Sequence, residues 1–175
     1  MNIVLAGFGG QGVLFAGKVI AHAGLLEGRE VSWLPSYGPE MRGGTANCSV
    51  CLSDEAVGCP LVLHPDLLIA MNRPSLEKFA ADTAPGGVIV YDSALAAAAP
   101  VPGEGVRLAP VAAAPMAETE GLGGLANMIL LGRALAETGF AALDMVEAAI
   151  RKCIPPKKQH LAEPNLRALH LGMSV

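Results

Sequence analysis

Charged side chains are scarce in this 175-residue chain. Asp, Glu, Lys and Arg make up 16% of it and aromatic residues only 4%, whereas an ordinary globular domain has about 25% charged residues. Hydrophobic residues account for 52%, so small and aliphatic side chains supply most of the apolar mass. So few charges leave apolar surface to cover, and we expect a large permanent interface with other chains, or a homodimer when the chain is isolated. The alternative is an alanine-rich core beneath a sparsely charged surface.

Other absences exclude whole classes of function. The formal net charge is −4, and no basic run is longer than Lys157-Lys158, so the electrostatic footprint of nucleic-acid binding is missing. Gly, Pro or charged residues interrupt every apolar stretch before the roughly 18 residues that a membrane span needs. Met1 leads directly into an apolar segment without a basic flank or a cleavage pattern. We therefore expect a cytoplasmic protein.

The four cysteines suit a reducing compartment: Cys48, Cys51, Cys59 and Cys153. Cys48 and Cys51 formally make a CxxC pair, which raises zinc, iron–sulfur and thioredoxin-type interpretations. The pair falls in an expected strand, where residues three apart point to opposite faces, and no second pair follows. The sequence predicts buried structural cysteines.

Short apolar runs alternate with helical segments along the chain. We expect strands over residues 2–6, 31–34, 46–52, 67–71, 87–91 and 106–109. Helices are expected over residues 13–26, 73–81, 125–137, 143–153 and about 164–170, with residues 94–115 as a surface connection. This alternation predicts one domain over residues 1–175, built on a Rossmann-like open α/β sheet that is mostly parallel, with helices on both faces.

A glycine-rich turn joins the first expected strand to the first expected helix. Its residues follow the order G-x-G-x-x-G: Gly7, Gly9, Gly10, Gln11 and Gly12. Backbone amides and a helix N-terminus at such a turn can hold a phosphate. The same glycines can instead serve only a tight turn and close strand–helix packing.

A dinucleotide site also needs an acidic residue after the second strand. Here Pro35 and Ser36 follow that strand, and the nearby Glu30 precedes it. A nicotinamide or flavin site is therefore incompletely specified.

A polar loop over residues 36–44 carries a hydroxyl, a phenol, a carboxylate and a guanidinium on a glycine-rich backbone. Its candidate binding residues are Ser36, Tyr37, Gly38, Glu40, Arg42, Gly43 and Gly44. Arg42 could hold a carboxylate or phosphate through two parallel hydrogen bonds. It could equally pair with Glu40 or a partner subunit and only fix the shape of the loop.

Asn127 lies on the apolar side of its expected helix, where an unpaired amide would cost about 1–3 kcal/mol. As a first-turn residue it is either a buried helix cap or a side chain that faces a ligand or a subunit. The same two interpretations apply to Asn165 in the last helix.

Several motifs in order give the chain a family resemblance. The segments are GFGGQGV, SYGPEMRGG, PDLLIA, GLANM and NLRA, starting at Gly7, Ser36, Pro65, Gly124 and Asn165. Together they resemble the gamma subunit of 2-oxoacid:ferredoxin oxidoreductases, the group of pyruvate, 2-oxoglutarate, 2-oxoisovalerate and indolepyruvate enzymes. The resemblance covers nearly the whole chain, although the residues just before Asn165 depart from the glutamate-rich lead-in of the family.

The resemblance implies a role inside a larger enzyme. Such enzymes decarboxylate a 2-oxoacid on thiamine diphosphate with Mg²⁺, pass electrons through [4Fe–4S] clusters to ferredoxin, and transfer the acyl group to coenzyme A. It places thiamine on the alpha and beta subunits, and the clusters on beta or a small delta subunit. The gamma chain would then carry no cofactor and no catalytic residue, be inactive alone, complete the assembly, and help to close over coenzyme A.

Two alternatives stay open on the sequence alone. One is a free-standing Rossmann-type oxidoreductase that binds NAD or FAD, and the other is an assembly module without any ligand.

Overall fold

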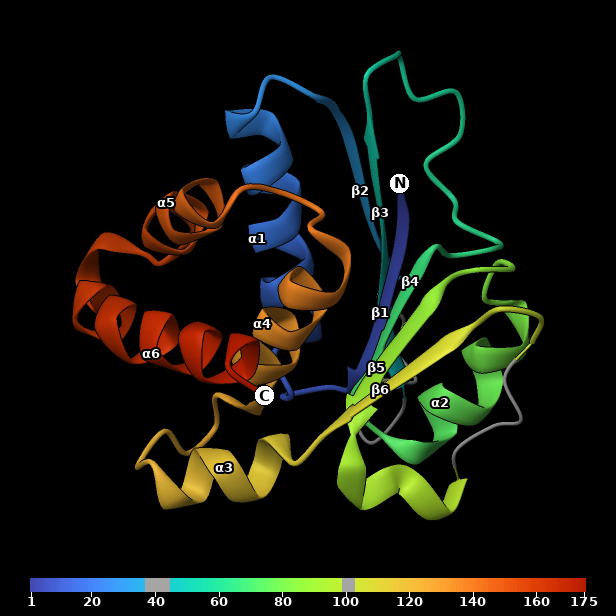
Figure 1. Ribbon diagram of the computed structural model, residues 1–175. Coiled ribbons are helices and arrows are strands. Elements are labelled where there is room, and N and C mark those ends of the chain that lie inside the picture. The colour runs from blue at the N-terminus through green and yellow to red at the C-terminus, as the bar shows by residue number, and fades with distance from the viewer. Residues whose placement is uncertain (37–44, 99–102) are drawn as a thin grey trace.

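A single six-stranded sheet organises the chain in the computed structural model, which describes residues 1–36, 45–98 and 103–175 (Figure 1). The sheet order is β2-β3-β1-β4-β5-β6. The strands are β1 (Asn2–Phe8), β2 (Glu30–Ser36), β3 (Thr45–Ser53), β4 (Leu67–Ala70), β5 (Val88–Asp92) and β6 (Arg107–Val111). The α-helices are α1 (Val13–Leu26), α2 (Arg73–Phe79), α3 (Ala113–Thr119), α4 (Ala126–Thr138), α5 (Leu143–Cys153) and α6 (Ala162–Met173), with 3-10 segments η2 (Ala80–Asp82), η3 (Ser93–Ala98) and η4 (Pro156–Leu161).

One part of the sheet is parallel. β1 pairs with β4, β4 with β5, and β5 with β6, all in parallel register. Every residue of β4 and β5 is buried, because helices cover both faces of a parallel sheet and its strands are therefore continuous apolar runs. The prediction of a mostly parallel open sheet is confirmed.

The other part is antiparallel. β3 pairs antiparallel with both β1 and β2. Only residues 37–44 separate β2 from β3, and a parallel crossover needs a dozen residues or more. Pro35 lies within β2 instead of ending it, and the edge of a sheet is where a strand tolerates proline.

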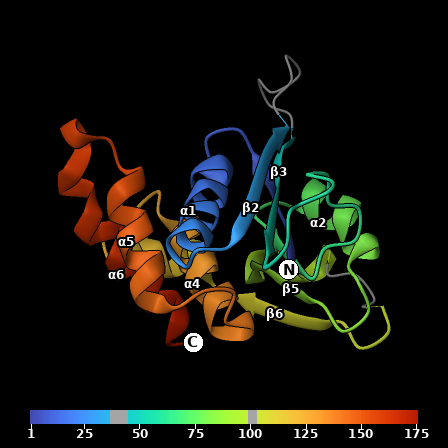
Figure 2. The ribbon, with the colours of Figure 1, turned by 90° about the horizontal axis from the view of Figure 1, so that it is seen from above.

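Helices cover the sheet unequally. The larger core lies on the face covered by α1, α4, α5 and α6, and a smaller core lies under α2 on the opposite face (Figure 2). The prediction of helices on both faces is confirmed. No helix within the described residues is long and apolar enough to cross a membrane.

α4 and α6 approach each other at two glycines. A Cβ atom on Gly132 would collide with the carbonyl of Leu169, and one on Gly172 would collide with the carbonyl of Ile129. The two backbones can cross this closely only because both positions lack a side chain.

The sequence-based helices differ from the structure mainly around residue 113. α3 begins there, at the end of the stretch that we expected to be a surface connection. Its Pro115 occupies the first turn, where the N–H group that proline lacks would have no partner within the helix. α6 also begins two residues earlier than expected, at Ala162.

Candidate functional site

The glycine-rich turn lies where the helices that connect the strands switch from one face of the sheet to the other. β1 and β4 are neighbours, but α1 follows β1 on one face while α2 follows β4 on the other. In open α/β sheets, ligands bind in the crevice outside the carboxyl ends of strands at such a point. Gly7, Gly9, Gly10, Gln11 and Gly12 all lie here, where the motif predicted them.

Glycine is required at the end of β1 and in the turn that follows it, for two different reasons. Gly12 has a φ of 76°, a left-handed conformation that residues with side chains rarely adopt. A Cβ on Gly7 would lie 2.8 Å from Gln11 Oε1 and 2.9 Å from Met71 Cβ. These glycines therefore allow the turn to pack closely against the neighbouring side chains, whether or not it also binds a ligand.

Gln11 holds the turn onto the sheet. Its Oε1 accepts a hydrogen bond from the Phe8 N–H at 2.6 Å, and its Nε2 donates to the Met71 carbonyl at 3.0 Å. Each end of the side-chain amide is bonded inside the protein, so Gln11 fixes the position of the turn on the sheet.

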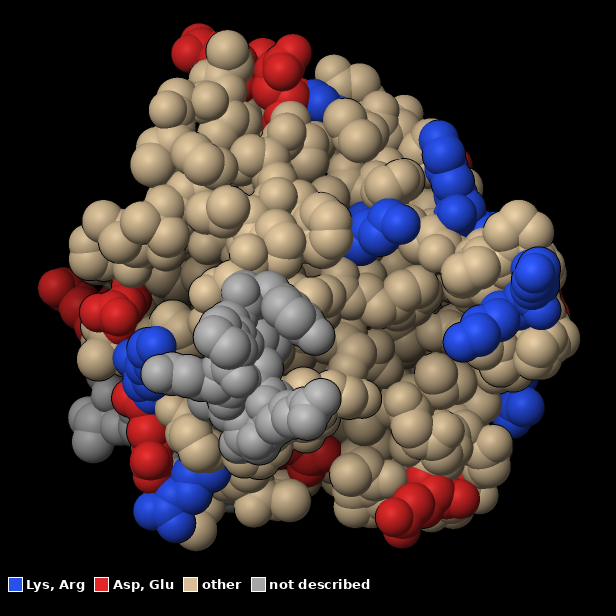
Figure 3. Space-filling model, turned by 180° about the vertical axis from the view of Figure 1, so that it is seen from behind, with Lys and Arg blue, Asp and Glu red and all other residues tan. Residues whose placement is uncertain are grey.

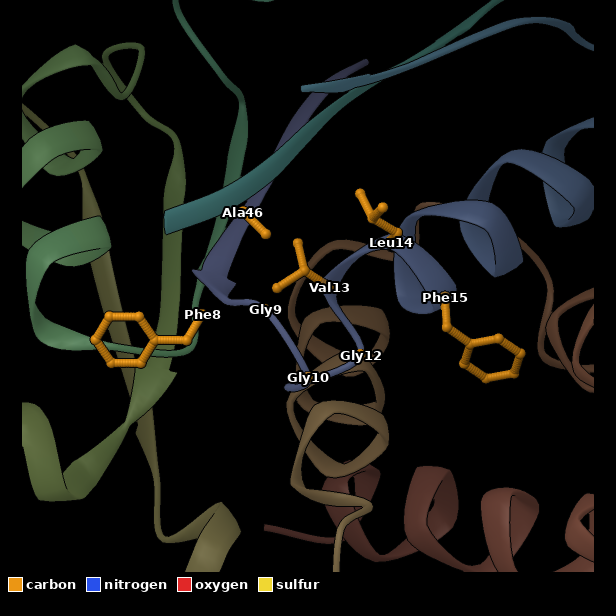
Figure 4. A pocket seen from close by; sticks show the side chains of 8 residues that line it. All are labelled: Phe8, Gly9, Gly10, Gly12, Val13, Leu14, Phe15 and Ala46. Atoms are coloured by element: carbon orange, nitrogen blue, oxygen red, sulfur yellow. The ribbon is translucent and has the colours of Figure 1, made fainter. Parts of the chain in front are cut away.

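The N-terminus of α1 offers backbone donors toward this crevice. Gly12 is its N-cap residue, no side chain caps the helix, and its first turn carries no acidic residue. The first N–H groups of a helix lack partners within it and carry a partial positive charge. A hollow of about 300 Å³ opens beside them, and Figure 4 shows Gly9, Gly10 and Gly12 as bare backbone between the side chains of Phe8 and Phe15. An anion such as a phosphate fits these donors.

A second hollow, of about 390 Å³, extends from Gly10 across the carboxyl ends of the neighbouring strands. Its acidic residue, Asp92 at the end of β5, is buried. The two carboxylate oxygens accept hydrogen bonds from the N–H groups of Ala94 and Ala114, each at 2.9 Å. Asp92 therefore fixes the starts of η3 and α3.

Asn127 joins α4 to the glycine turn. Only 6% of the residue is exposed, and its Nδ2 donates to the Gly12 carbonyl at 3.3 Å. The carbonyl can only accept, so the amide must turn its NH₂ group toward it, and Oδ1 is left buried without a partner. Leu125 is the N-cap residue of α4, so the interpretation of Asn127 as a helix cap is wrong.

Asn165 is not a helix cap either. The N-cap residue of α6 is Leu161, and no side chain caps that helix. Asn165 Nδ2 instead donates to the Leu161 carbonyl at 2.7 Å. A third hollow, of about 290 Å³, lies between Asn165, Asn127 and the α5–α6 connection.

Ser36 is the one residue of the predicted polar loop that lies within the described residues. Ser36 is the exposed last residue of β2 and pairs with Asn47 of β3. The remaining candidates lie outside the described residues: Tyr37, Gly38, Glu40, Arg42, Gly43 and Gly44.

The two cysteines of the CxxC pair lie apart, as predicted. Cys48 is buried next to Gly17 of α1, and burial raises the pKa of its thiol to about 12. The Cys51 thiol contacts the Cys59 carbonyl at 3.8 Å, on the other side of β3. The prediction of buried residues is confirmed for both members of the pair, whereas Cys59 is exposed.

The sheet order also bears on the NAD or FAD alternative. In a dinucleotide-binding unit the second strand lies beside the first, but here β3 separates β2 from β1. The strand order therefore gives that alternative no support.

Comparison with known proteins identifies the family. Residues 2–175 match the family described as pyruvate ferredoxin/flavodoxin oxidoreductase. The chain is 44% identical to ketoisovalerate oxidoreductase subunit VorA of Methanothermobacter thermautotrophicus, over 98% of this chain but only 35% of that protein. It is 33% identical to 2-oxoglutarate synthase subunit KorC of Methanocaldococcus jannaschii, over 99% of this chain and 92% of that protein.

Solved structures agree with this match. A keto/oxoacid ferredoxin oxidoreductase gamma subunit from Geobacter sulfurreducens superposes with a TM-score of 0.82 at 29% identity, covering 99% of this chain and 96% of that one. The 2-oxoglutarate:ferredoxin oxidoreductase of Magnetococcus marinus, solved with 2-oxoglutarate, coenzyme A and succinyl-CoA bound, gives a TM-score of 0.84 at 25% identity, over 99% of this chain and 30% of that one. The chain thus belongs to the pyruvate ferredoxin/flavodoxin oxidoreductase family, and its fold is that of the gamma subunit of 2-oxoacid:ferredoxin oxidoreductases.

Proposed function

We propose that this chain is the gamma part of an enzyme that oxidatively decarboxylates a 2-oxoacid to an acyl-coenzyme A and reduces ferredoxin. In this proposal thiamine diphosphate, Mg²⁺ and the [4Fe–4S] clusters belong to the alpha, beta and delta partners. The chain alone is inactive, and no residue of it is catalytic. As a single domain over residues 1–175, it completes the assembly and contributes to the binding of coenzyme A.

The uncapped N-terminus of α1 supports the coenzyme A role most directly. Coenzyme A carries phosphate groups, and the bare turn from Gly9 to Gly12 leads into a helix whose first turn lacks both a capping side chain and an acidic residue. The N–H groups there would hold a phosphate, and the glycines would let it approach the backbone closely. Arg42 of the polar loop would add a guanidinium to the same ligand.

A charge placed at Leu14 tests this role. Leu14 is the second residue of α1, is partly exposed, and lines the hollow at the turn. Leu14→Glu should raise the KM for coenzyme A in the assembled enzyme by roughly 2- to 30-fold, because the carboxylate neutralises the helix N-terminus and repels phosphate. Leu14→Gln is the uncharged control of equal size. Its KM for coenzyme A should stay close to that of the wild-type enzyme.

The same pair of variants separates binding from damage to the fold. In the isolated chain, Leu14→Glu should be more stable than Leu14→Gln by about 0.3–1 kcal/mol, because an acidic residue favours a helix N-terminus. A raised KM in a more stable chain would support the anion site. Equal KM values for the two variants would contradict it and favour the alternative of an assembly module without a ligand.

A further inference from the structure

β2 forms one edge of the sheet. It stands first in the order β2-β3-β1-β4-β5-β6 and pairs with β3 alone. The outer edge of such a strand presents backbone N–H and C=O groups that another strand can pair with.

The register identifies which groups point outward. Met1 and Leu52 exchange two backbone hydrogen bonds, of 2.6 and 2.9 Å, so Leu52 of β3 turns its N–H and C=O toward β1. Leu52 is opposite Val31 of β2. Because antiparallel pairs alternate along a ladder, Val31, Trp33 and Pro35 must turn their backbone groups away from β3.

This outward edge lacks the usual protection against pairing. No residue between 31 and 36 is charged, although exposed edges are commonly protected by lysine or other charges. Trp33 and Leu34 are 37% and 39% exposed. Pro35 is the one protective feature of the strand, because it has no N–H to offer.

We propose that β2 pairs with β2 of a second copy of this chain, antiparallel and about a two-fold axis at Trp33. In this register the two Trp33 residues exchange N–H···O=C bonds, and the Val31 N–H of each copy donates to the Pro35 carbonyl of the other. The missing Pro35 N–H leaves only the Val31 carbonyl without a donor. The two six-stranded sheets would then form one continuous sheet.

The charge distribution favours a second copy over a different partner. A two-fold axis places a strand against itself, so a charge near the axis would face its own like charge. β2 has none near Trp33, and its terminal Glu30 would face the uncharged Ser36 of the other copy. The edge is therefore complementary to itself in hydrogen bonding, charge and apolar character.

Val31→Pro tests the pairing by removing two hydrogen bonds of the dimer and none of the monomer. Sedimentation of the isolated chain over a concentration series should show a dimer for the wild type, and Val31→Pro should raise its dissociation constant roughly 5- to 140-fold. Val31→Ala keeps the N–H and loses a similar amount of side chain, so it should dimerise nearly as the wild type does. Pro35→Ala restores a donor and should tighten the dimer.

Hydrogen exchange supplies a second measurement within the same strand. The amides of Val31 and Trp33 should become protected as the concentration rises, whereas those of Ser32 and Leu34, which point toward β3, should be protected at every concentration. A monomer throughout the series, or equal dissociation constants for Val31→Pro and Val31→Ala, would overturn the proposal. Protection of Val31 and Trp33 only when alpha or beta chains are added would also overturn it and assign the edge to that partner. The measurements on the isolated chain do not depend on the proposed enzymatic function.

Discussion

The cysteines differ in burial, and we expect them to differ in reactivity for that reason. Cys48 is fully buried and Cys59 is exposed. Burial disfavours the charged thiolate and raises the pKa of Cys48 from its ordinary value of 9.0 to about 12. We expect iodoacetamide at pH 8 to modify Cys59 readily in the folded chain and Cys48 only after unfolding, as peptide mass spectrometry would show. Fast modification of Cys48 in the folded chain would contradict its placement.

The raised pKa also fixes the sign of a pH dependence. The pKa of the Cys48 thiol in the unfolded chain is its ordinary value of 9.0, so below that pH the neutral thiol contributes fully to the stability of the folded chain. This contribution is lost as the pH rises from 9 toward 12, because the unfolded chain can then ionise the thiol and the folded chain cannot.

The sequence allowed some residues to be placed and not others. The separation of Cys48 from Cys51 follows from the two-residue period of a strand and could be predicted. The contact between Asn127 and Gly12 could not, because their separation of 115 positions is set by how α4 packs on the sheet. Apolar periodicity showed only that Asn127 would be buried.

At the scale of elements, the α4–α6 crossing depends on two glycines. Gly172→Ala places a methyl group against the Ile129 carbonyl, where only a backbone shift could relieve the contact. We expect it to lower the free energy of unfolding by about 1–3 kcal/mol or more in urea titrations. Gly123→Ala is the matched control, since a Cβ there meets no atom within 4 Å, and it should leave the stability nearly unchanged. Equal stability of both variants would contradict the close crossing.

Most elements could be located from apolar runs, turn residues and their alternation, and α1 and α5 have the predicted bounds. The antiparallel insertion of β3 was missed, although the sequence carried a sign of it. The sequence predicts no helix between the second and third strands, and a connection only as long as residues 37–44 favours an antiparallel pairing. α3 was not predicted, because it begins in a stretch rich in alanine, proline and glycine. Helix propensity alone does not distinguish a short helix from a loop there.

For the whole molecule, the scarcity of charged residues is the property that indicates contacts with other chains. Figure 3 shows acidic and basic side chains scattered over one face, with broad uncharged areas between them. Nine large apolar side chains are exposed within the described residues, among them Phe8, Leu61 and Leu63. Partner subunits of the proposed oxidoreductase, together with a second copy at β2, would cover such areas.

Purification of the tagged chain from its source tests the central claim most directly. We expect it to bring with it chains that contain thiamine diphosphate and [4Fe–4S] clusters. The complex should reduce a viologen dye only when a 2-oxoacid and coenzyme A are both present, and the isolated chain should reduce none. Turnover by the isolated chain, free of other polypeptides, or purification without any such partner would contradict the account.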